Sequence, residues 1–478
     1  MMRTRKTKIL ATLGPSSEDI DTIRKLHEAG ADVFRINMSH ASHDLMRELV
    51  RRIRKVEEDC GHPIGILGDL QGPKHRLGTF ENESIDVEPG DVITLDSDPT
   101  PGTQSRVHLP HRDILESVDV GQRLLINDGR CCLKVIDKGD GYLKTEVVSG
   151  TLLSDRKGVN LPDTNLYSGA LTDKDRKDLE ALLQEDIDWL ALSFIQRPED
   201  LAEARKLCRG KVGIMAKIEK PQAVERLDDI IEMTDAVMVA RGDLGVEMPL
   251  QGVPAIQKQM IRKCRRAGKP VVVATQMLES MISASVPTRA EVSDVATAVY
   301  EGADAVMLSA ESAAGDYPVE AVAMMDSIAN SVEADANYRS ILTAQKPPPE
   351  PTGSDAISTA AAQIADTLNL SAIICYTASG STGLRAARVR PEVPVLALSP
   401  ITGTARRLAL VWGLHCVVSP DATDLDDMVD RACTVAFSEG IAGAGSRVII
   451  SAGVPLRTPG ATNMLRIAYI GADGKSGV

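Results

Sequence analysis

The sequence predicts an α/β protein built around a closed barrel of eight parallel strands. Short apolar runs rich in Val, Ile and Leu recur along the first two thirds of the chain, and each ends in polar or charged residues. Every run is too short for a helix and has the composition of a strand buried on both faces. A helical segment follows each run, so the eight strand–helix units predict a (β/α)8 TIM barrel. The runs cover residues 6–12, 32–37, 63–69, 188–194, 212–219, 236–243, 270–275 and 305–311.

A long insertion separates the third run from its helix. Between residues 77 and 163 the chain is strand-rich and helix-poor, and its apolar and polar residues alternate. Gly139-Asp140-Gly141 has the composition of a hairpin turn. We expect a small β-barrel or sandwich here, placed at the mouth of the large barrel where it can act as a lid. The large barrel then comprises residues 1–76 and 164–345.

The last part of the chain predicts a separate α/β domain over residues 346–478. A proline-rich segment, residues 347–351, marks a stiff linker at its start. Five apolar runs follow, with helical segments between several of them. These runs cover residues 371–377, 393–399, 415–419, 447–451 and 466–470.

Composition excludes several classes of protein. The net charge of −13 disfavours a general polyanion binder, and 3% aromatic residues are too few for stacking on nucleic acids. None of the 8 cysteines forms a CxxC pair, which favours reduced thiols. The basic N-terminus leads into a short apolar run that breaks at Gly14-Pro15, and no run is long enough to span a membrane. We expect a cytoplasmic protein that binds neither nucleic acid nor membrane.

The carboxyl ends of the predicted barrel strands carry cations, carboxylates and hydroxyls, and barrels of this kind place their chemistry there. Such a ring predicts a metal ion and an anionic substrate. Its members are Arg35, Asn37, Ser39, Asp69, Ser193, Lys217, Glu219, Arg241, Asp243, Thr275, Ser309 and Glu311.

Two carboxylates on adjacent strands predict a divalent metal site. Alternation places Lys217 and Glu219 on one face of the fifth strand, and Asp243 ends the sixth. Because no Cys or His accompanies them, these oxygens suit Mg²⁺ or Mn²⁺ better than Zn²⁺. The alternative is a structural ring of ion pairs that also includes Arg241. Gly242, beside the second carboxylate, favours the metal.

Other strand ends allow two interpretations each. Arg35, Asn37 and Ser39 share one face of the second strand. Arg35 presents a planar fork to phosphate or carboxylate, or instead forms a salt bridge with Asp69. Thr275 ends the seventh strand, where its hydroxyl either caps the next helix or touches substrate.

A loop of small and hydroxyl-bearing residues follows the first strand of the C-terminal domain. Backbone N–H groups at the start of the next helix can hold a phosphate there. A hydroxyl N-cap with a turn glycine explains the same residues without a ligand. The loop consists of Thr377, Ala378, Ser379, Gly380, Ser381 and Thr382.

Read in order, the motifs of this chain resemble the pyruvate kinase family. IEKPQAV, VARGDLGVEMP, ATQMLESM, PTRAEVSDVATAV and MLSAESAAGDYPVEA match it, and RINMSH, GDLQGP and KGVNLP agree. The match spans nearly the entire chain, including the inserted lid and the C-terminal domain. The resemblance implies transfer of a phosphoryl group from phosphoenolpyruvate to ADP, giving pyruvate and ATP, in a homotetramer.

The resemblance also implies roles for the matched residues. Glu219 and Asp243 match the metal carboxylates, and Lys217 matches the lysine that stabilises charge on the phosphoryl group and the enolate. Arg35 matches the arginine on the phosphate, and Thr275 the threonine near the face where the enolate is protonated. The implied sites are Asn37, Ser39, Asp69 and Lys74 for the monovalent cation; Arg35, Lys217, Ser193, Gly242, Asp243 and Thr275 for substrate; and Arg35, His40, Arg76 and Lys157 for nucleotide.

The chain departs from the family pattern at several positions, which include Ala310 in place of a glycine. Many members have Lys-Gly-Pro-Glu in the third-strand motif and need K⁺, whereas this chain has Gln-Gly-Pro-Lys ending in Lys74. A fixed ammonium there, with Leu70 and Gln71 before it, resembles the bacterial K⁺-independent subgroup and predicts a need for Mg²⁺ but not K⁺. Ala314 replaces a lysine that contacts nucleotide phosphate, and His75 replaces a commonly aliphatic residue.

The family match also bears on regulation and on competing functions. Residues 377–382 match an effector phosphate pocket, which predicts activation by fructose bisphosphate, a sugar monophosphate or AMP. A phosphoenolpyruvate mutase or a relative of pyruvate–phosphate dikinase is disfavoured by the lid motifs and by the missing catalytic His segment. A non-catalytic metabolite sensor would be expected to lose Lys217, Glu219 or Asp243, and all three are present.

Overall fold

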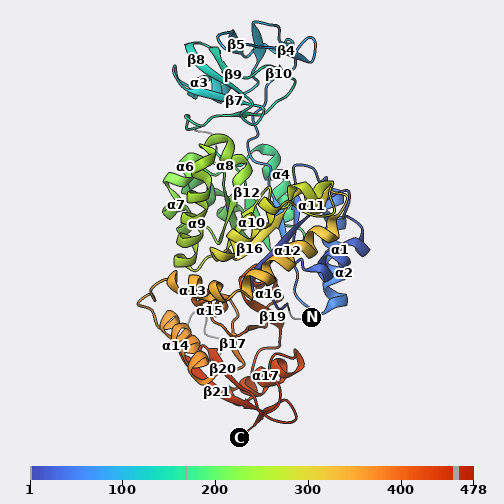
Figure 1. Cartoon of the computed structure of the whole chain (residues 1–478), viewed down its shortest axis with the longest axis vertical. Coiled ribbons are helices and arrows are strands. Elements are labelled where there is room, and N and C mark those ends of the chain that lie inside the picture. The colour runs from blue at the N-terminus through green and yellow to red at the C-terminus, as the bar shows by residue number, and fades with distance from the viewer. Residues whose placement is uncertain (1–2, 167–168, 456–461, 478) are drawn as a thin grey trace.

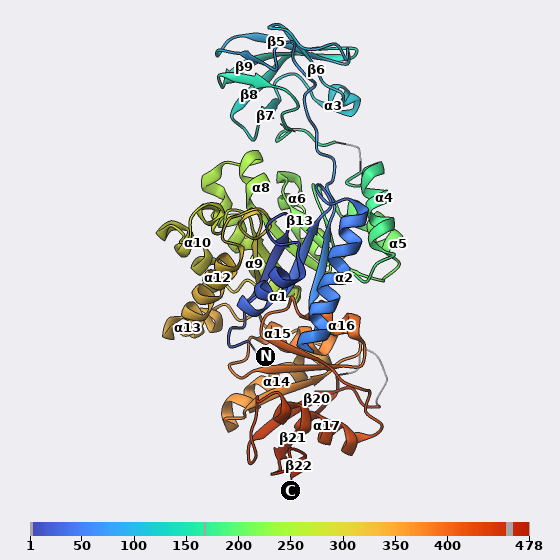
Figure 2. The same cartoon turned by 90° about the vertical axis from the view of Figure 1, so that its right-hand side faces the viewer.

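The chain is organised as three units stacked along one long axis (Figures 1 and 2). The computed structural model describes residues 3–166, 169–455 and 462–477. The inserted β-rich unit lies at one end, the barrel in the middle and the C-terminal α/β unit at the other end.

The eight predicted strands close into one barrel, as the sequence predicts. Its strands pair in the order β1-β16-β15-β14-β13-β12-β3-β2, and every pair is parallel. They are β1 Lys8–Leu13, β2 Val33–Asn37, β3 Gly65–Asp69, β12 Trp189–Leu192, β13 Gly213–Ile218, β14 Ala236–Ala240, β15 Val271–Ala274 and β16 Ala305–Leu308.

Both faces of these strands are buried because helices cover the outside and side chains fill the inside. Ile9 and Ala11 of β1 pack in the cluster beneath the helices, whereas Leu10 belongs to a second cluster of the barrel interior. That interior cluster also contains Leu410 of the C-terminal domain. The C-terminal domain therefore takes part in the packing of the barrel core at its base.

The helices around the barrel begin where the sequence supplies caps. Thr172 and Thr288 each form a capping box, with Asp175 and Glu291 respectively, at the start of α4 and α10. The helices are α1 Ile20–Ala29, α2 His43–Cys60, α4 Asp173–Leu182, α5 Pro198–Cys208, α6 Pro221–Glu225, α7 Leu227–Met233, α8 Arg241–Glu247, α9 Val253–Ala267, α10 Arg289–Tyr300, α11 Ala310–Ala313, α12 Pro318–Glu333 and α13 Ala336–Ala344, with 3-10 turns η1 Leu250–Gly252 and η2 Glu279–Ile282.

The insertion is a β-domain with its own apolar core. Six strands pair in the order β11-β7-β8-β9-β5-β6, and β10 pairs with β4. The turn at residues 139–141 joins the antiparallel strands β8 and β9, as predicted. The elements are β4 Ser84–Asp86, β5 Val92–Asp96, β6 Arg106–His108, α3 Arg112–Ser117, β7 Arg123–Ile126, β8 Cys131–Gly139, β9 Tyr142–Ser149, β10 Leu152–Ser154 and β11 Val159–Asn160.

The C-terminal domain is a mixed sheet covered by helices. Its strands pair in the order β19-β18-β17-β20-β21-β22, parallel from β19 to β20 and antiparallel beyond. The elements are α14 Gly353–Leu368, β17 Ala372–Tyr376, α15 Ser381–Val389, β18 Val395–Ser399, α16 Thr402–Leu408, β19 Leu414–Val418, α17 Leu425–Ser438, β20 Arg447–Ala452, β21 Met464–Ile470 and β22 Ser476–Gly477. No helix within the described ranges is both long and apolar enough to cross a bilayer.

Candidate active site at the barrel mouth

Four neighbouring barrel strands bring the predicted polar residues together. In barrel order, β13, β12, β3 and β2 supply Lys217, Ser193, Asp69 and Arg35 at or just beyond their carboxyl ends. Parallel strands end on the same side of a barrel, which explains why residues so far apart in the sequence meet.

The ammonium of Lys217 lies at the centre of this group. Its Nζ donates to Ser193 Oγ at 2.7 Å and lies 3.0 Å from Glu219 Oε1 and 3.5 Å from Asp69 Oδ1. Burial lowers the pKa of Lys217, but the carboxylates of Asp69 and Glu219 outweigh that effect and the net pKa is raised. Lys217 therefore stays charged in a site with little water.

Glu219 and Asp243 have the oxygens that a divalent metal needs. Glu219 Oε2 accepts the N–H of Phe194 at 2.7 Å, whereas Glu219 Oε1 is buried without a hydrogen-bond partner in the described structure. Burial raises the pKa of Glu219, Lys217 opposes that effect, and Asp243 adds to it. Asp243, in the first turn of α8, forms no hydrogen bond or salt bridge with any described residue. Glu219 Oε1, which lies 3.0 Å from the Lys217 ammonium, and the carboxylate of Asp243 are oxygens of the kind that Mg²⁺ or Mn²⁺ takes as ligands.

The alternative predicted for Arg35, a salt bridge to Asp69, is present. Arg35 Nε and Nη2 each lie 2.7 Å from Asp69 Oδ2, and Nη1 donates to Thr12 Oγ1 at 3.1 Å. The side chain of Asp69 is 1% exposed and that of Arg35 is 11% exposed. Because the same carboxylate also approaches Lys217, Asp69 positions both cations on one side of the mouth.

Thr275 has a left-handed backbone conformation, and its hydroxyl caps α8, which precedes it in the sequence, instead of the helix that follows it. Its φ is 70°, a left-handed conformation that is rare for a β-branched residue. Its hydroxyl donates to the carbonyl of Ala274 at 2.6 Å and accepts the N–H of Gly242 at 2.7 Å. Gly242 lies in the first turn of α8. Thr275 therefore fixes the start of the helix that carries Asp243.

The predicted ion-pair ring does not include Arg241. The Nη1 of Arg241 lies 2.7 Å from Asp294 Oδ1, and its Nη2 donates to the carbonyl of Thr275 at 2.7 Å. Arg241 thus braces the backbone that holds Thr275, and the only close cation of Glu219 in the described structure is Lys217.

Comparisons with known proteins show the family to which the chain belongs. Residues 4–322 match the family model described as pyruvate kinase, barrel domain, and residues 355–468 match pyruvate kinase, alpha/beta domain. A pyruvate kinase of Methylorubrum extorquens is 58% identical over 98% of both chains. The chain belongs to the pyruvate kinase family. It is a phosphotransferase of that family.

More distant pyruvate kinases keep the same architecture. One from Agrobacterium vitis is 46% identical over 98% of this chain and 99% of its own. A crystal structure of a pyruvate kinase from Cryptosporidium parvum is 32% identical, with a TM-score of 0.92 over 97% of this chain and 96% of that one. The barrel, inserted lid and C-terminal domain are therefore a shared fold, as predicted.

The predicted monovalent-cation residues of this pyruvate kinase family member form a loose group. Asn37 Oδ1 accepts the N–H of Ser39 at 3.1 Å, and Asp69 binds Arg35. Lys74 is exposed, and in the described ranges its ammonium forms no ion pair. Lys74 remains available to other groups at the mouth.

The residues predicted for nucleotide lie at the mouth and on the connections to the lid. His40 is exposed just beyond β2, and Arg76 donates to the carbonyl of Arg156 at 3.0 Å. Lys157 is half-buried, and its carbonyl accepts the N–H of Leu77 at 2.9 Å. Among the described contacts, none joins His40, Arg76 and Lys157 to one another. Their role in binding nucleotide is a prediction.

The structure gives partners to His75, whose presence the family pattern did not explain. Its ring lies 4.7 Å from that of His111, and its Nε2 lies 3.9 Å from Asp113 Oδ2. Burial, and then the neighbouring His111, lowers the pKa of His75 to about 4.

Ala314 is exposed after α11, and its methyl group offers no charge to a nucleotide.

The predicted effector loop opens α15 and is tied down by its own side chains. Gly380 has a φ of 94°, and its N–H bonds to Thr377 Oγ1 at 2.9 Å. The hydroxyls of Ser379 and Ser381 lie 3.1 Å apart, and Thr382 Oγ1 lies 2.8 Å from Thr462 Oγ1. The N-cap of α15 is Gly380, which receives no side-chain cap bond, so the structure contains the turn glycine of the N-cap alternative but not its hydroxyl cap.

Sequence reasoning missed Thr12 and, although it placed Glu311 at the mouth, gave that carboxylate no bridging role. Thr12, at the end of the first predicted strand, holds Arg35, and the strand-end rule could have found it. The buried carboxylate of Glu311 accepts the N–H groups of Ser309 at 2.7 Å and Leu278 at 3.2 Å, which joins the segments after β15 and β16. No sequence signal indicated that bridging role.

Proposed function

We propose that the chain transfers the phosphoryl group of phosphoenolpyruvate to ADP, giving pyruvate and ATP in the last step of glycolysis. The observation that carries this proposal is the placement of two cations, Lys217 and Arg35, beside the buried carboxylates of Asp69 and Glu219. Two polyanionic substrates repel each other, and fixed positive charge at the transferring group offsets that repulsion.

Glu219 and Asp243 would hold Mg²⁺ or Mn²⁺, which when bound would neutralise charge on the phosphoryl and enolate oxygens. Arg35 binds the phosphate through the N–H groups that Asp69 and Thr12 leave unused. Lys217 places its ammonium against the phosphoryl and enolate oxygens, oriented by its hydrogen bond to Ser193. Both cations are held before substrate arrives, so little reorganisation is needed in the reaction.

Thr275 would act on the enolate product. Its Oγ1 carries a proton and is fixed between the carbonyl of Ala274 and the N–H of Gly242. Because that proton is donated to Ala274, Thr275 would not supply the proton itself but would orient a separate proton donor, such as water, through its remaining lone pair. The strained backbone at Thr275 fits a residue held for function.

The inserted domain would act as a lid that excludes water. Asn160 in β11 donates to Glu247 Oε1 at 3.0 Å, and the same oxygen lies 2.6 Å from Lys220 Nζ. Glu247 ends α8, the helix that carries Asp243. Movement of the lid is therefore coupled by direct contact to the proposed metal site, and lid closure protects the phosphoryl group from hydrolysis.

We also propose that the activity needs Mg²⁺ but not K⁺, and that a phosphorylated metabolite activates it. Lys74 supports the first point because it follows β3 and carries an exposed, fixed positive charge that could replace K⁺. The second is supported by a cavity of about 430 Å³ that Ser379 and Ser381 line together with Arg407 and Lys269. Arg407 forms no salt bridge within the described structure, so its charge is available to a phosphate.

A homotetramer in the cytoplasm is the assembly and location that we propose from the family. The decisive experiment for the activity is a lactate dehydrogenase-coupled assay with phosphoenolpyruvate, ADP and Mg²⁺. We expect turnover that depends on all three. Folded protein that forms no pyruvate under these conditions would overturn the proposal.

A further inference from the structure

Two histidines and a glutamate converge where the base of the barrel meets the C-terminal domain. His62 lies in the connection between α2 and β3, His415 lies in β19, and Glu439 follows α17. One ligand atom from each residue lies within 4.8 Å of the other two. His415 Nε2 is 2.8 Å from Glu439 Oε2, and His62 Nε2 is 3.8 Å from the same oxygen. We call these three residues the interdomain cluster.

We propose that the interdomain cluster binds a zinc ion and thereby cross-links the barrel to the C-terminal domain. Two imidazole nitrogens and one carboxylate oxygen are a ligand set that zinc accepts, with water in the fourth tetrahedral position. Zinc ligands around one ion lie roughly 3.3 Å apart, since each bond is about 2.0–2.1 Å long. The cluster distances of 2.8 and 3.8 Å bracket that separation, so small side-chain shifts suffice.

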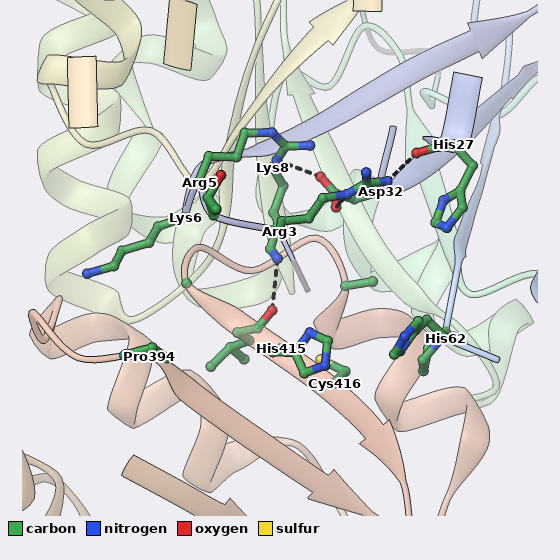
Figure 3. A pocket seen from close by; sticks show the side chains of 15 residues that line it. Arg3, Arg5, Lys6, Lys8, His27, Asp32, His62, Pro394, His415 and Cys416 are labelled. Atoms are coloured by element: carbon green, nitrogen blue, oxygen red, sulfur yellow. Dashed lines mark hydrogen bonds and ion pairs between the residues drawn. The ribbon is translucent and has the colours of Figure 1, made fainter. Parts of the chain in front are cut away.

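The cluster is accessible to an ion. The side chains of His62, His415 and Glu439 are 20%, 14% and 21% exposed. Figure 3 shows the two imidazole rings side by side at the edge of a cavity, one from the barrel segment and one from the C-terminal strand. Their centroids are 5.3 Å apart, and the planes are inclined by 61°. His62 Nδ1 is buried and has no hydrogen-bond partner in the described ranges, so this ring is not fixed by a competing network.

The cations around the cluster are held by other groups, and the ligand types favour zinc. Arg3, Arg5 and Lys8 line the same cavity and would repel a cation. Arg3 and Arg5 are paired with Asp32 at 3.6 and 2.8 Å, and Lys8 Nζ donates to the carbonyl of Leu414 at 2.8 Å. Among the described residues, the cluster contains one carboxylate, that of Glu439, which is too few for Ca²⁺ or Mg²⁺. Short bonds from nitrogen favour zinc instead.

The surroundings of the imidazoles favour the form that coordination requires. Burial lowers the pKa of both His62 and His415, which favours the neutral rings. A coordinating nitrogen must carry no proton, so a proton on His415 Nε2, the nitrogen that faces Glu439, would have to move to Nδ1 when the ion binds.

A second cluster of the same residue types provides the natural control. His75, His111 and Asp113 also have ligand atoms within 4.8 Å of one another. However, His111 Nε2 already accepts the N–H of Arg76 at 3.0 Å, and all three residues belong to the lid or its connection. An ion there would join no two domains.

An ion in the interdomain cluster would reinforce existing contacts. Arg406 in α16 lies 2.7 Å from Glu57 in α2, and Arg390 lies 3.0 Å from Asp304 at the start of β16. These ion pairs already hold the C-terminal domain against the barrel. Because unfolding separates the three ligands, zinc binds the native state preferentially and raises the thermal midpoint.

The test uses the full-length protein, stripped with a chelator and then saturated with Mg²⁺ so that Glu219 and Asp243 are occupied. Zinc is titrated by competition with a chromophoric chelator, and cobalt is added in parallel because tetrahedral cobalt absorbs visible light. We expect one zinc per chain, a tetrahedral cobalt spectrum and a rise in the thermal midpoint. His62→Ala and Glu439→Gln should each weaken zinc binding roughly tenfold or more, whereas His111→Ala should not change it.

Glu439→Gln keeps the shape of the side chain, so it remains informative even if His62→Ala is unstable. The proposal is overturned if Glu439→Gln, folded by circular dichroism, binds zinc as tightly as the unmodified chain. It is equally overturned if His111→Ala abolishes the zinc and cobalt signals, because the ion then sits in the lid cluster.

Discussion

Replacing Lys217 with methionine tests both the chemistry and the electrostatics of the barrel mouth. The variant keeps the length of the side chain but removes the charge that lies 3.0 Å from Glu219 and 3.5 Å from Asp69. Removing one electrostatic stabiliser of a transition state costs about 2.7–4 kcal/mol. Because each 1.36 kcal/mol corresponds to a factor of about ten, we expect kcat to fall by at least two to three orders of magnitude.

The same substitution should also lower the free energy of unfolding. Glu219 and Asp69 are each 1% exposed, and breaking a buried ion pair costs about 3–5 kcal/mol when one charge is left uncompensated. The pKa of Glu219 is already raised, and loss of Lys217 raises it further. In Lys217→Met, Glu219 therefore binds a proton in the native state at pH values where it is ionised in the unfolded state. The loss of stability caused by the substitution should become smaller as the pH falls through the raised pKa of Glu219.

The assay combines the coupled activity measurement with denaturant unfolding at several pH values. Arg54→Met is a matched control because Arg54 is also paired with a buried carboxylate, at 2.7 Å from Asp188 Oδ2, but Asp188 lies just before β12, at the end of the barrel away from the mouth. We expect the control to lose stability with a much smaller loss of kcat. Turnover near that of the unmodified chain in folded Lys217→Met would refute the assigned role, and a pH-independent destabilisation would refute the electrostatic account.

The remaining predictions concern the cation site, the effector loop and acid stability. The unmodified chain should have nearly full activity with Mg²⁺ in buffer free of Na⁺ and K⁺, whereas the activity of Lys74→Glu should depend on K⁺. Strong stimulation of the unmodified chain by K⁺ would contradict K⁺ independence. Ser379→Glu or Ser381→Glu should abolish activation by sugar phosphates through charge repulsion while basal kcat stays unchanged; unchanged activation curves in both would exclude the loop as the effector site. Burial, and then Arg3, lowers the pKa of His27 from 6.5 to about 4, so the unfolded state binds more protons between these values. Acidification over that range should therefore lower the free energy of unfolding by up to about 3 kcal/mol. Urea unfolding at about pH 7 and about pH 4.5 should show a smaller decrease for His27→Gln than for the unmodified chain. Equal decreases in the two proteins would refute this explanation.

The sequence by itself determined the barrel and much of its mouth. Strands buried on both faces must be almost wholly apolar, so each run was visible without any contact information. The alternation of side chains along a strand then placed Lys217 and Glu219 on one face, and both point to the same site in the structure. The hairpin at residues 139–141 was equally local, because Gly141 tolerates the φ of 75° that the turn requires.

Only the tertiary structure decided which side chains pair. Arg241 meets Asp294 rather than Glu219, and Thr275 caps α8 rather than the helix that follows it in sequence. The interdomain cluster joins His62 to His415, which are far apart along the chain. Local patterns fix an element and its buried face, but contacts between elements depend on the packing of the whole barrel against its two attached domains, and no single segment encodes that packing.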